Sequence, residues 1–227
     1  MATTTVQRRR GRFTGLSLED RKAERRRLLL DAAFELLATE GWSGTTVRAV
    51  CQRSGLNPRY FYESFPDRDA LAVAVFERLV GELREVLVAA MDAAPPDLPA
   101  QTRAAVEATV RFLVDDPRRA RVMYVEAVGI DALDRRRIDT GYQMMSFIVD
   151  DARRRQRVPK RADPTVDLTA AVLVGGMSEV MLAWIEGRLE IAQDQLVDDL
   201  TAMFVALCEE AGRVAARRRG AGTVPRP

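Results

Sequence analysis

Apolar residues recur at three- and four-residue spacings along most of the chain, and no stretch alternates as a half-buried strand does. With its glycine, proline and capping signals, the pattern predicts an all-α protein of about nine helices. The expected helices cover residues 18–40, 47–54, 58–64, 67–93, 100–115, 117–128, 131–156, 165–186 and 193–217. No internal repeat is visible, so a solenoid is not expected.

The two shortest predicted helices are joined by a single glycine turn. Thr46 is expected to cap the start of the first, and Asn57 the start of the second, with Pro58 at the first helical position. Gly55 would take a left-handed conformation between them, because it has no Cβ. This order predicts a helix-turn-helix.

The second short helix carries an unusual outward face. Phe61 and Phe65, four residues apart, would bury its inner side. Helical phase then places Arg59, Tyr60 and Tyr62 toward solvent. A guanidinium group and phenol hydroxyls suit phosphate oxygens and base edges, so the pattern favours insertion into a DNA groove.

Composition narrows the function further. The chain has 227 residues, 47% of them hydrophobic and 30% charged, which is typical of a globular protein. No uninterrupted apolar run is long enough to span a membrane, and the basic N-terminus lacks a following apolar stretch, so we expect a cytoplasmic protein with no membrane partner. Histidine is absent, and the two cysteines, Cys51 and Cys208, are far apart. We therefore expect no catalytic site, no metal and no cofactor.

The positive charge is concentrated near the N-terminus. Residues 1–27 hold nine Arg or Lys and three acidic side chains, a net charge of +6 against +2 for the whole chain. A basic arm on a mildly acidic body is typical of a protein that binds phosphates. A solvated tail without DNA contacts explains the same residues.

The segment from residue 29 to residue 76 contains four consecutive motifs. They are AA-x-x-LL-x-x-x-GW in the first helix, T-x-V-R before the second, G-L-x-P at the turn, and F-Y-x-x-F-x-x-R-x-x-L after it. Together they resemble the DNA-binding domain of TetR/AcrR-type transcriptional regulators, and chain length and helix number fit that family. The resemblance implies an N-terminal three-helix DNA-binding domain and a larger C-terminal helical domain for ligand binding and dimerisation.

The resemblance also implies roles for single residues. Thr46 would contact a phosphate, Tyr62 the DNA backbone, and Arg68 stands where the family usually has a lysine. The expected DNA-binding residues are Thr46, Arg48, Asn57, Pro58, Arg59, Tyr60, Tyr62 and Arg68. Ser64 and Glu63 depart from the family pattern, and we expect Glu63 to lie along the groove edge or to pair with an arginine.

Beyond residue 95 the resemblance is architectural only. The last two helices would pair with those of a second copy through Ala170, Ala171, Val174, Gly175, Leu196, Leu200, Phe204 and Leu207. A pocket for a small, mostly apolar ligand would be lined by Phe112, Met123, Tyr124, Met144, Met145, Phe147, Met177, Met181 and Trp184. Both sets also fit ordinary core packing.

The sequence therefore predicts a homodimeric repressor that a small ligand releases from a double-stranded DNA operator. The expected parts are a basic flexible arm at 1–17, a helix-turn-helix domain at 18–66, a ligand-binding and dimerisation domain at 67–217, and a flexible tail at 218–227. Two alternatives stay open: a DNA-binding regulator without a small-molecule effector, and a helical carrier of apolar metabolites. The operator, the regulated genes and the ligand are not encoded in any motif.

Overall fold

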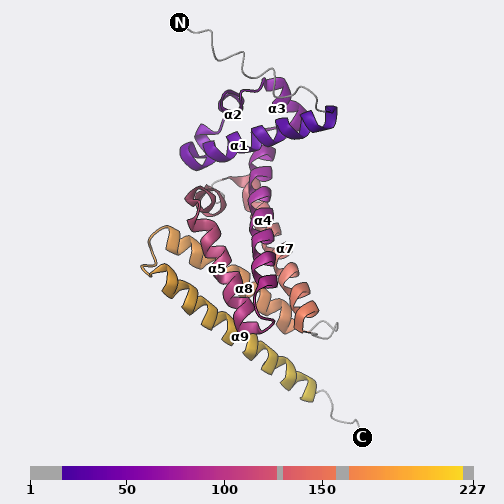
Figure 1. Cartoon of the computed structure of the whole chain (residues 1–227), viewed down its shortest axis with the longest axis vertical. Helices are drawn as coiled ribbons and strands as arrows, with labels where there is room; N and C mark the ends of the chain where they lie inside the picture. The colour runs from indigo at the N-terminus through magenta and orange to yellow at the C-terminus, as the bar shows by residue number, and fades with distance from the viewer. Residues whose placement is uncertain (1–16, 127–129, 157–163, 222–227) are drawn as a thin grey trace. The chain divides into compact units, whose positions relative to one another are not determined.

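The computed structural model describes residues 17–126, 130–156 and 164–221, and all regular structure in these ranges is helical (Figure 1). The all-α class expected from the sequence is therefore confirmed. The elements are α1 (Leu18–Gly44), α2 (Val47–Ser54), α3 (Pro58–Ser64), α4 (Arg68–Ala93), α5 (Leu98–Val114), α6 (Pro117–Ala120), η2 (Arg121–Val125), α7 (Asp131–Gln156), α8 (Pro164–Ile185) and α9 (Gln193–Ala221). The predicted basic arm lies outside the described residues, except for its last residue, and most of the predicted tail lies outside them too.

Most predicted bounds agree with the structure within three residues, and the differences have local causes. The first helix breaks at Gly41, which has φ 68°, before a last turn that ends at Gly44. The helix α5 begins two residues early because the Asp97 carboxylate accepts a hydrogen bond from the Ala100 N–H at 2.8 Å. The predicted helix at 117–128 is a four-residue α-helix followed by a π-helix, η2. The last helix runs four residues further, to Ala221.

The chain divides into two compact units, Met1–Val75 and Phe76–Pro227, and the division falls within α4. In the first unit, α1 packs against both α2 and α3 (Figure 1). Leu29, Leu37, Val50 and Phe61 are fully buried there. The first unit is therefore a small three-helix core that the start of α4 completes. The predicted domain boundary at 66/67 stays a prediction.

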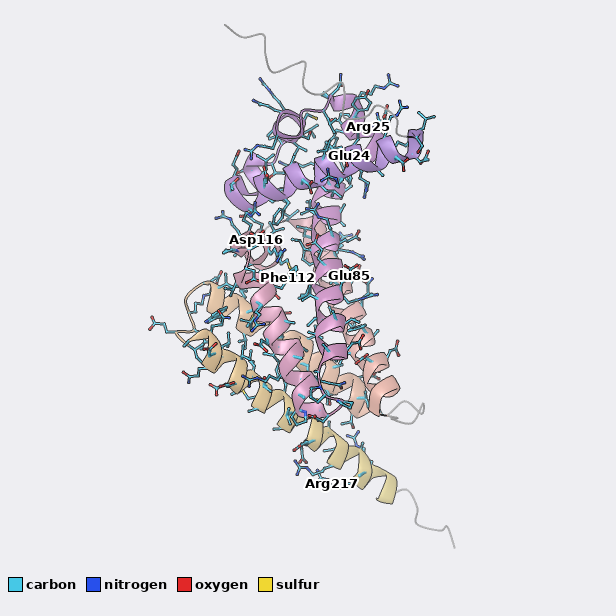
Figure 2. The ribbon with its side chains drawn as sticks, in the orientation of Figure 1. Glu24, Arg25, Glu85, Phe112, Asp116 and Arg217 are labelled. Carbon is cyan, nitrogen blue, oxygen red and sulfur yellow. The ribbon has the colours of Figure 1, made fainter. Side chains whose placement is uncertain are left out.

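In the second unit α5 packs against α9, and α8 packs against both α7 and α9 (Figure 1). Val106, Val110, Leu133 and Met181 are at most 1% exposed in its core. Asp116 lies at the turn between α5 and α6 (Figure 2). Its carboxylate accepts hydrogen bonds from the Arg118 backbone N–H at 3.1 Å and from Arg118 Nε at 2.8 Å, which fix the turn. These bonds lower the pKa of Asp116 below its ordinary value.

The helix α8 is unusually apolar for a helix that is mostly not buried within the protein. Among the described residues it is the one helix long and apolar enough to cross a membrane by length and composition, and 11% of its most apolar window is buried. Leu168 and Val172 on α8 are 64% and 48% exposed, and Met203 on α9 is 65% exposed. The second unit thus leaves an apolar face uncovered on α8 and α9.

Candidate nucleic-acid interface and ligand cavity

The helix-turn-helix is fixed by caps close to one another in sequence. The Thr46 hydroxyl accepts a hydrogen bond from the Ala49 N–H at 3.1 Å, which starts α2. Gly55 ends α2 with φ 66°, a left-handed conformation that favours glycine. The Asn57 side chain accepts a hydrogen bond from the Arg59 N–H at 2.8 Å, and Pro58 begins α3. The turn chemistry read from the sequence is the chemistry that the structure uses.

Aromatic packing decides which face of α3 is open. Phe61 is fully buried and Phe65 is 3% exposed, with their ring centroids 6.0 Å apart. The Arg26 guanidinium of α1 lies 4.2 Å from the Phe65 ring centroid and donates a hydrogen bond to the Ser64 carbonyl oxygen at 3.0 Å. In contrast, the Tyr62 side chain is 60% exposed. The helix α3 is therefore anchored through one side and open on the other.

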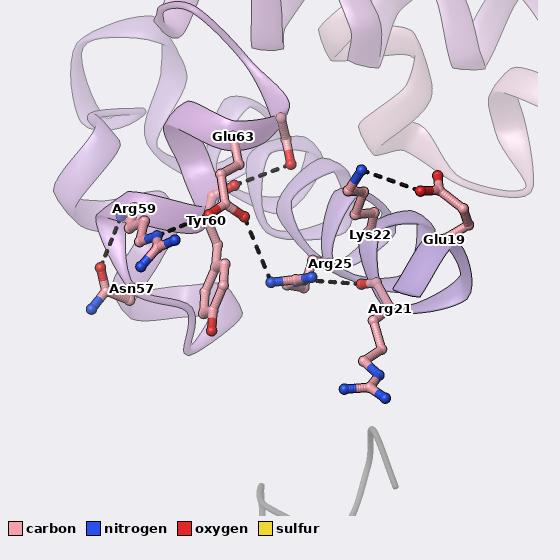
Figure 3. Close-up of polar contacts among 9 residues, drawn as sticks. Glu19, Arg21, Lys22, Arg25, Asn57, Arg59, Tyr60 and Glu63 are labelled. Atoms are coloured by element: carbon pink, nitrogen blue, oxygen red, sulfur yellow. Dashed lines mark hydrogen bonds and ion pairs between the residues drawn. The ribbon is translucent and has the colours of Figure 1, made fainter. Parts of the chain in front are cut away.

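A network of charged groups covers the open side of α3. The Glu63 carboxylate lies 2.9 Å from Arg59 Nε and 3.7 Å from an Arg25 Nη atom (Figure 3). The Arg25 guanidinium also lies 4.3 Å from the Tyr60 ring centroid and donates a hydrogen bond to the Arg21 carbonyl oxygen at 3.0 Å. Glu63 thus pairs with two arginines, one on its own helix and one on α1.

The sequence-predicted DNA-binding residues fall into two groups. Exposed positions on α2, α3 and their caps hold Thr46, Arg48, Asn57, Pro58, Arg59 and Tyr62. The other two are engaged within the first unit. Tyr60 lies under Arg25, while the Arg68 guanidinium stacks 3.7 Å from the Trp42 ring centroid and donates a hydrogen bond to the Trp42 carbonyl oxygen at 3.3 Å. Their roles in DNA contact stay predictions.

Sequence reasoning missed the part that α1 plays in this surface. Arg25 and Arg26 of α1 both contact α3, through Glu63 and Tyr60 in one case and through Ser64 and Phe65 in the other. The signal available was the run of three arginines at 25–27, on a helix that must pack against α3. The run was interpreted only as part of a basic arm.

The second unit contains a cavity of about 480 Å³, within the usual size range for small-molecule sites. Five of the predicted ligand-binding residues line it: Met123, Tyr124, Met144, Phe147 and Met177. Its wall also includes Phe76 and Leu83 of α4, which sequence reasoning did not select. Spacing could not reveal them, because α4 reads as one long apolar stripe.

The other predicted ligand residues lie elsewhere. Phe112 is 4% exposed and lies against the Arg119 guanidinium, 4.3 Å from its ring centroid, and Met181 is fully buried. The Trp184 indole donates a hydrogen bond to the Ile191 carbonyl oxygen at 2.9 Å and is not part of the wall. The Met145 side chain lies outside the described side chains. Phe112, Met181 and Trp184, which the sequence assigned to a ligand, instead contact other parts of the protein.

Most of the residues predicted to form a dimer pack in the core or line the cavity of a single copy. Ala170, Leu196 and Leu200 are at most 5% exposed, so they belong to the core of the second unit. Val174, Gly175 and Phe204 line the cavity, while Ala171 and Leu207 are partly buried. The exposed apolar side chains on the same two helices are instead those of Leu168, Val172 and Met203.

Among the residues that the structure describes, no group of three or more His, Cys, Asp or Glu side chains is placed to hold a metal ion. Cys51 is buried and Cys208 is partly buried, and burial raises the pKa of both thiols. A raised pKa keeps a thiol protonated, and the thiolate is the reactive form.

Comparison with known proteins agrees with this geometry. Residues 29–75 match the family model described as bacterial regulatory proteins, tetR family. The HTH-type transcriptional regulator BetI of Rhizobium meliloti (strain 1021) is 33% identical over 70 residues, which are 31% of this chain and 34% of that protein. The chain therefore matches about a third of the length of this curated relative.

Solved structures extend the likeness to the whole fold. A transcriptional regulator from Pseudomonas aeruginosa PAO1 superposes with a TM-score of 0.68 at 24% identity, covering 91% of this chain and 97% of that one. The transcriptional regulator FadR from Bacillus subtilis, solved in complex with stearoyl-CoA, gives a TM-score of 0.65 at 15% identity, covering 79% of this chain and 97% of that one. Residues 29–75 therefore carry the helix-turn-helix segment of the tetR family of bacterial regulatory proteins, in a chain whose overall fold is shared with these solved structures.

Proposed function

We propose that this protein is a sequence-specific DNA-binding regulator of transcription that works as a homodimeric repressor and is released from its operator by a small ligand. One observation carries the proposal: α3 buries Phe61 and Phe65 and turns Arg59 and Tyr62 outward, on a helix-turn-helix that matches the family model. In such motifs the second helix enters the major groove with its N-terminal residues at the base edges. Arg59 lies in that first turn.

The pairing of Arg59 supports a role in base reading. Its Nε atom is bonded to Glu63 at 2.9 Å, and its side chain is 82% exposed. A guanidinium group fixed through Nε still presents its two terminal NH₂ groups, which is the fork that pairs with O6 and N7 of guanine. We therefore assign Arg59 to base contact, and Thr46 and Tyr62 to the DNA backbone.

The uncovered face of α8 and α9 supports a homodimer. Leu168, Val172 and Met203 are between 48% and 65% exposed in a single copy. Large exposed apolar side chains on two helices that pack together favour an interaction site, and a second copy can cover them with the same face. Pairing would place two copies of α3 at successive half-sites of a pseudo-palindromic operator.

The cavity supports control by a small ligand. Phe76 and Leu83 of its wall belong to α4, whose first turn carries Arg68 in the first unit. A ligand that favours one position of α4 would change how the reading helices meet DNA. A coupling of about 1–3 kcal/mol would weaken DNA binding roughly 5–150-fold. The stearoyl-CoA complex of FadR supports ligand binding in a protein of this fold.

Two other functions compete less well with these observations. A regulator without an effector leaves a cavity of about 480 Å³ without a purpose. A carrier of apolar metabolites leaves the exposed face of α3 and the family match over residues 29–75 unexplained. Repression rather than activation is taken from the family resemblance, and a DNA partner implies a protein that works in the cytoplasm.

The proposal is tested by selecting bound sequences from random DNA with the purified full chain. We expect a pseudo-palindromic consensus. Arg59→Ala should then reduce discrimination at one base of each half-site about 5–150-fold, since a good bidentate contact contributes about 1–3 kcal/mol. Arg111→Ala is the matched control, because Arg111 is an exposed arginine of α5 that pairs with Glu107 at 2.7 Å. Equal losses on consensus and random DNA for Arg59→Ala would contradict the assignment, and failure to enrich any sequence would overturn the function.

A further inference from the structure

Two polar side chains in the cavity wall have no hydrogen-bond partner among the described residues. Gln101 of α5 is 8% exposed, and its side-chain amide makes no hydrogen bond there. The Tyr124 hydroxyl likewise has none, and Tyr124 is a partly buried residue of the cavity wall. Both side chains line a largely apolar cavity, so the molecule that fills the cavity must supply the hydrogen bonds that the protein does not. These two groups point to something that binds in the cavity.

The backbone at Tyr124 is also unusual. Tyr124 and Met123, both in the wall, lie on the π-helix η2, which interrupts regular α-helical geometry between α6 and residue 126. Single π-turns are rare and are frequent at functional sites. Burial raises the pKa of Tyr124 to about 12, so its hydroxyl stays neutral at physiological pH and is able to donate a hydrogen bond.

The charges of the wall limit the ligand further. No Lys or Arg side chain is among its described residues, and its ionisable carboxylates are those of Asp151 and Glu179. Asp151 has interactions of its own within the protein, and the Thr109 hydroxyl is satisfied by the Ala105 carbonyl oxygen at 2.9 Å. A carboxylate or phosphate ligand would therefore find no cationic side chain in the wall itself and would meet negative charge there. The Arg84 guanidinium lies 5.5 Å from the ring centroid of the wall residue Phe147, but Arg84 is not part of the wall.

We propose that the cavity binds an uncharged, mostly apolar molecule whose hydroxyl or carbonyl oxygen is hydrogen-bonded by Tyr124 and Gln101. This inference rests on the proposed function and narrows its ligand to one chemical class. Tyr124 donates to the oxygen, and the Gln101 amide donates to a carbonyl or accepts from a hydroxyl. The apolar walls from α4, α5 and α7 take up the hydrocarbon part. An acyl-CoA, with its charged phosphates, does not match this set of side chains.

The test uses three probes with the same ten-carbon chain: decan-1-ol, decanoate and decylammonium. Each is titrated calorimetrically against the full-length protein at pH 7. We expect decan-1-ol to bind at least ten-fold more tightly than either ion. Tyr124→Phe and Gln101→Leu should each weaken decan-1-ol binding about 2- to 12-fold, the net worth of one hydrogen bond, with little effect on the ions. Tyr142→Phe is the matched control, because Tyr142 on α7 is 64% exposed and lies outside the wall.

Each other outcome overturns the inference. Tighter binding of decanoate would show an anion site, and tighter binding of decylammonium would assign the site to the two carboxylates. Unchanged decan-1-ol binding in both variants, or no binding of any probe, would show that Tyr124 and Gln101 hold no such ligand. DNA selection with the same protein preparation is run in parallel, so loss of the ligand class and loss of the regulatory function are seen separately. Thermal unfolding confirms that each variant is folded.

Discussion

The charge of Glu63 offers the sharpest test of the DNA-reading surface. Its carboxylate lies 2.9 Å from Arg59 Nε and 3.7 Å from Arg25, so one negative charge is shared by two guanidinium groups (Figure 3). Glu63→Gln keeps the size of the side chain and removes that charge. The free energy of unfolding should change little, because exposed pairs four residues apart on a helix are worth about 0.3–0.5 kcal/mol.

The effect on DNA binding is expected to be much larger. If the substitution allows one more phosphate to be neutralised, the slope of log K against log salt becomes steeper by about 0.9. Relative to 1 M salt, that slope corresponds to tighter binding of random DNA by about 15-fold at 50 mM and about 4-fold at 200 mM. Arg59 also loses the group that orients its fork. The preference for the operator over random DNA should therefore fall.

The measurement is fluorescence anisotropy with operator and random duplexes of equal length, over a series of salt concentrations. Glu107→Gln is the matched control, because Glu107 pairs with Arg111 at the same four-residue spacing on α5, at 2.7 Å. That variant should leave both slopes unchanged. If Glu63→Gln also leaves the salt slope and the random-DNA affinity unchanged, Glu63 does not face the phosphates and the docking of α3 is wrong.

Other changes test the rest of the structure. Gly55→Ala should lower the free energy of unfolding by about 1–2 kcal/mol, because the φ of 66° at Gly55 is left-handed. Gly81→Ala on α4 should be neutral or stabilising, because the added Cβ meets no atom within 4 Å. Urea titration measures both changes. Met203→Glu should shift the protein from dimer to monomer in sedimentation experiments, while a charge at Val86, which is 42% exposed on α4, should not. The raised pKa of Tyr124 means that its contribution to stability is complete below about pH 10 and declines as pH rises toward 12, because the unfolded state releases the proton first. Tyr124→Phe should flatten that decline in urea titrations at several alkaline pH values, and an unchanged decline would show that Tyr124 is not deeply placed.

The helix-turn-helix could be predicted because its determinants are local. Thr46, Gly55 and Asn57 act within three or four residues of their own positions, and the spacing of Phe61 and Phe65 fixes the buried face of α3. Each of these signals needs only standard helix geometry. The contact between Arg25 and Tyr60 joins residues 35 positions apart in sequence, and no pattern along the chain contains that information.

The second unit was harder to predict because its helices are apolar on several sides. A helix that is hydrophobic all round gives no phase from which to choose the face that meets solvent. Ala170 was predicted to face a partner but is 2% exposed, whereas Leu168, two residues earlier and therefore on the opposite side of the helix, is 64% exposed. The π-helix at Tyr124 is likewise invisible to a pattern that assumes 3.6 residues per turn. Packing against other helices decides both which face of α8 is exposed and where the π-helix forms.

The helix α4 joins the two halves of the proposed mechanism. Its first residue, Arg68, is held by the ring and the carbonyl oxygen of Trp42 in the first unit, and its later residues Phe76 and Leu83 line the cavity of the second. This helix has 26 residues, which corresponds to a length of about 39 Å. A ligand affects DNA binding only if it binds more tightly to one of two positions of this helix. Under the proposed mechanism, a response to ligand depends on how Phe76 and Leu83 contact it in each position of the helix, and the affinity of the ligand alone would change nothing at α3.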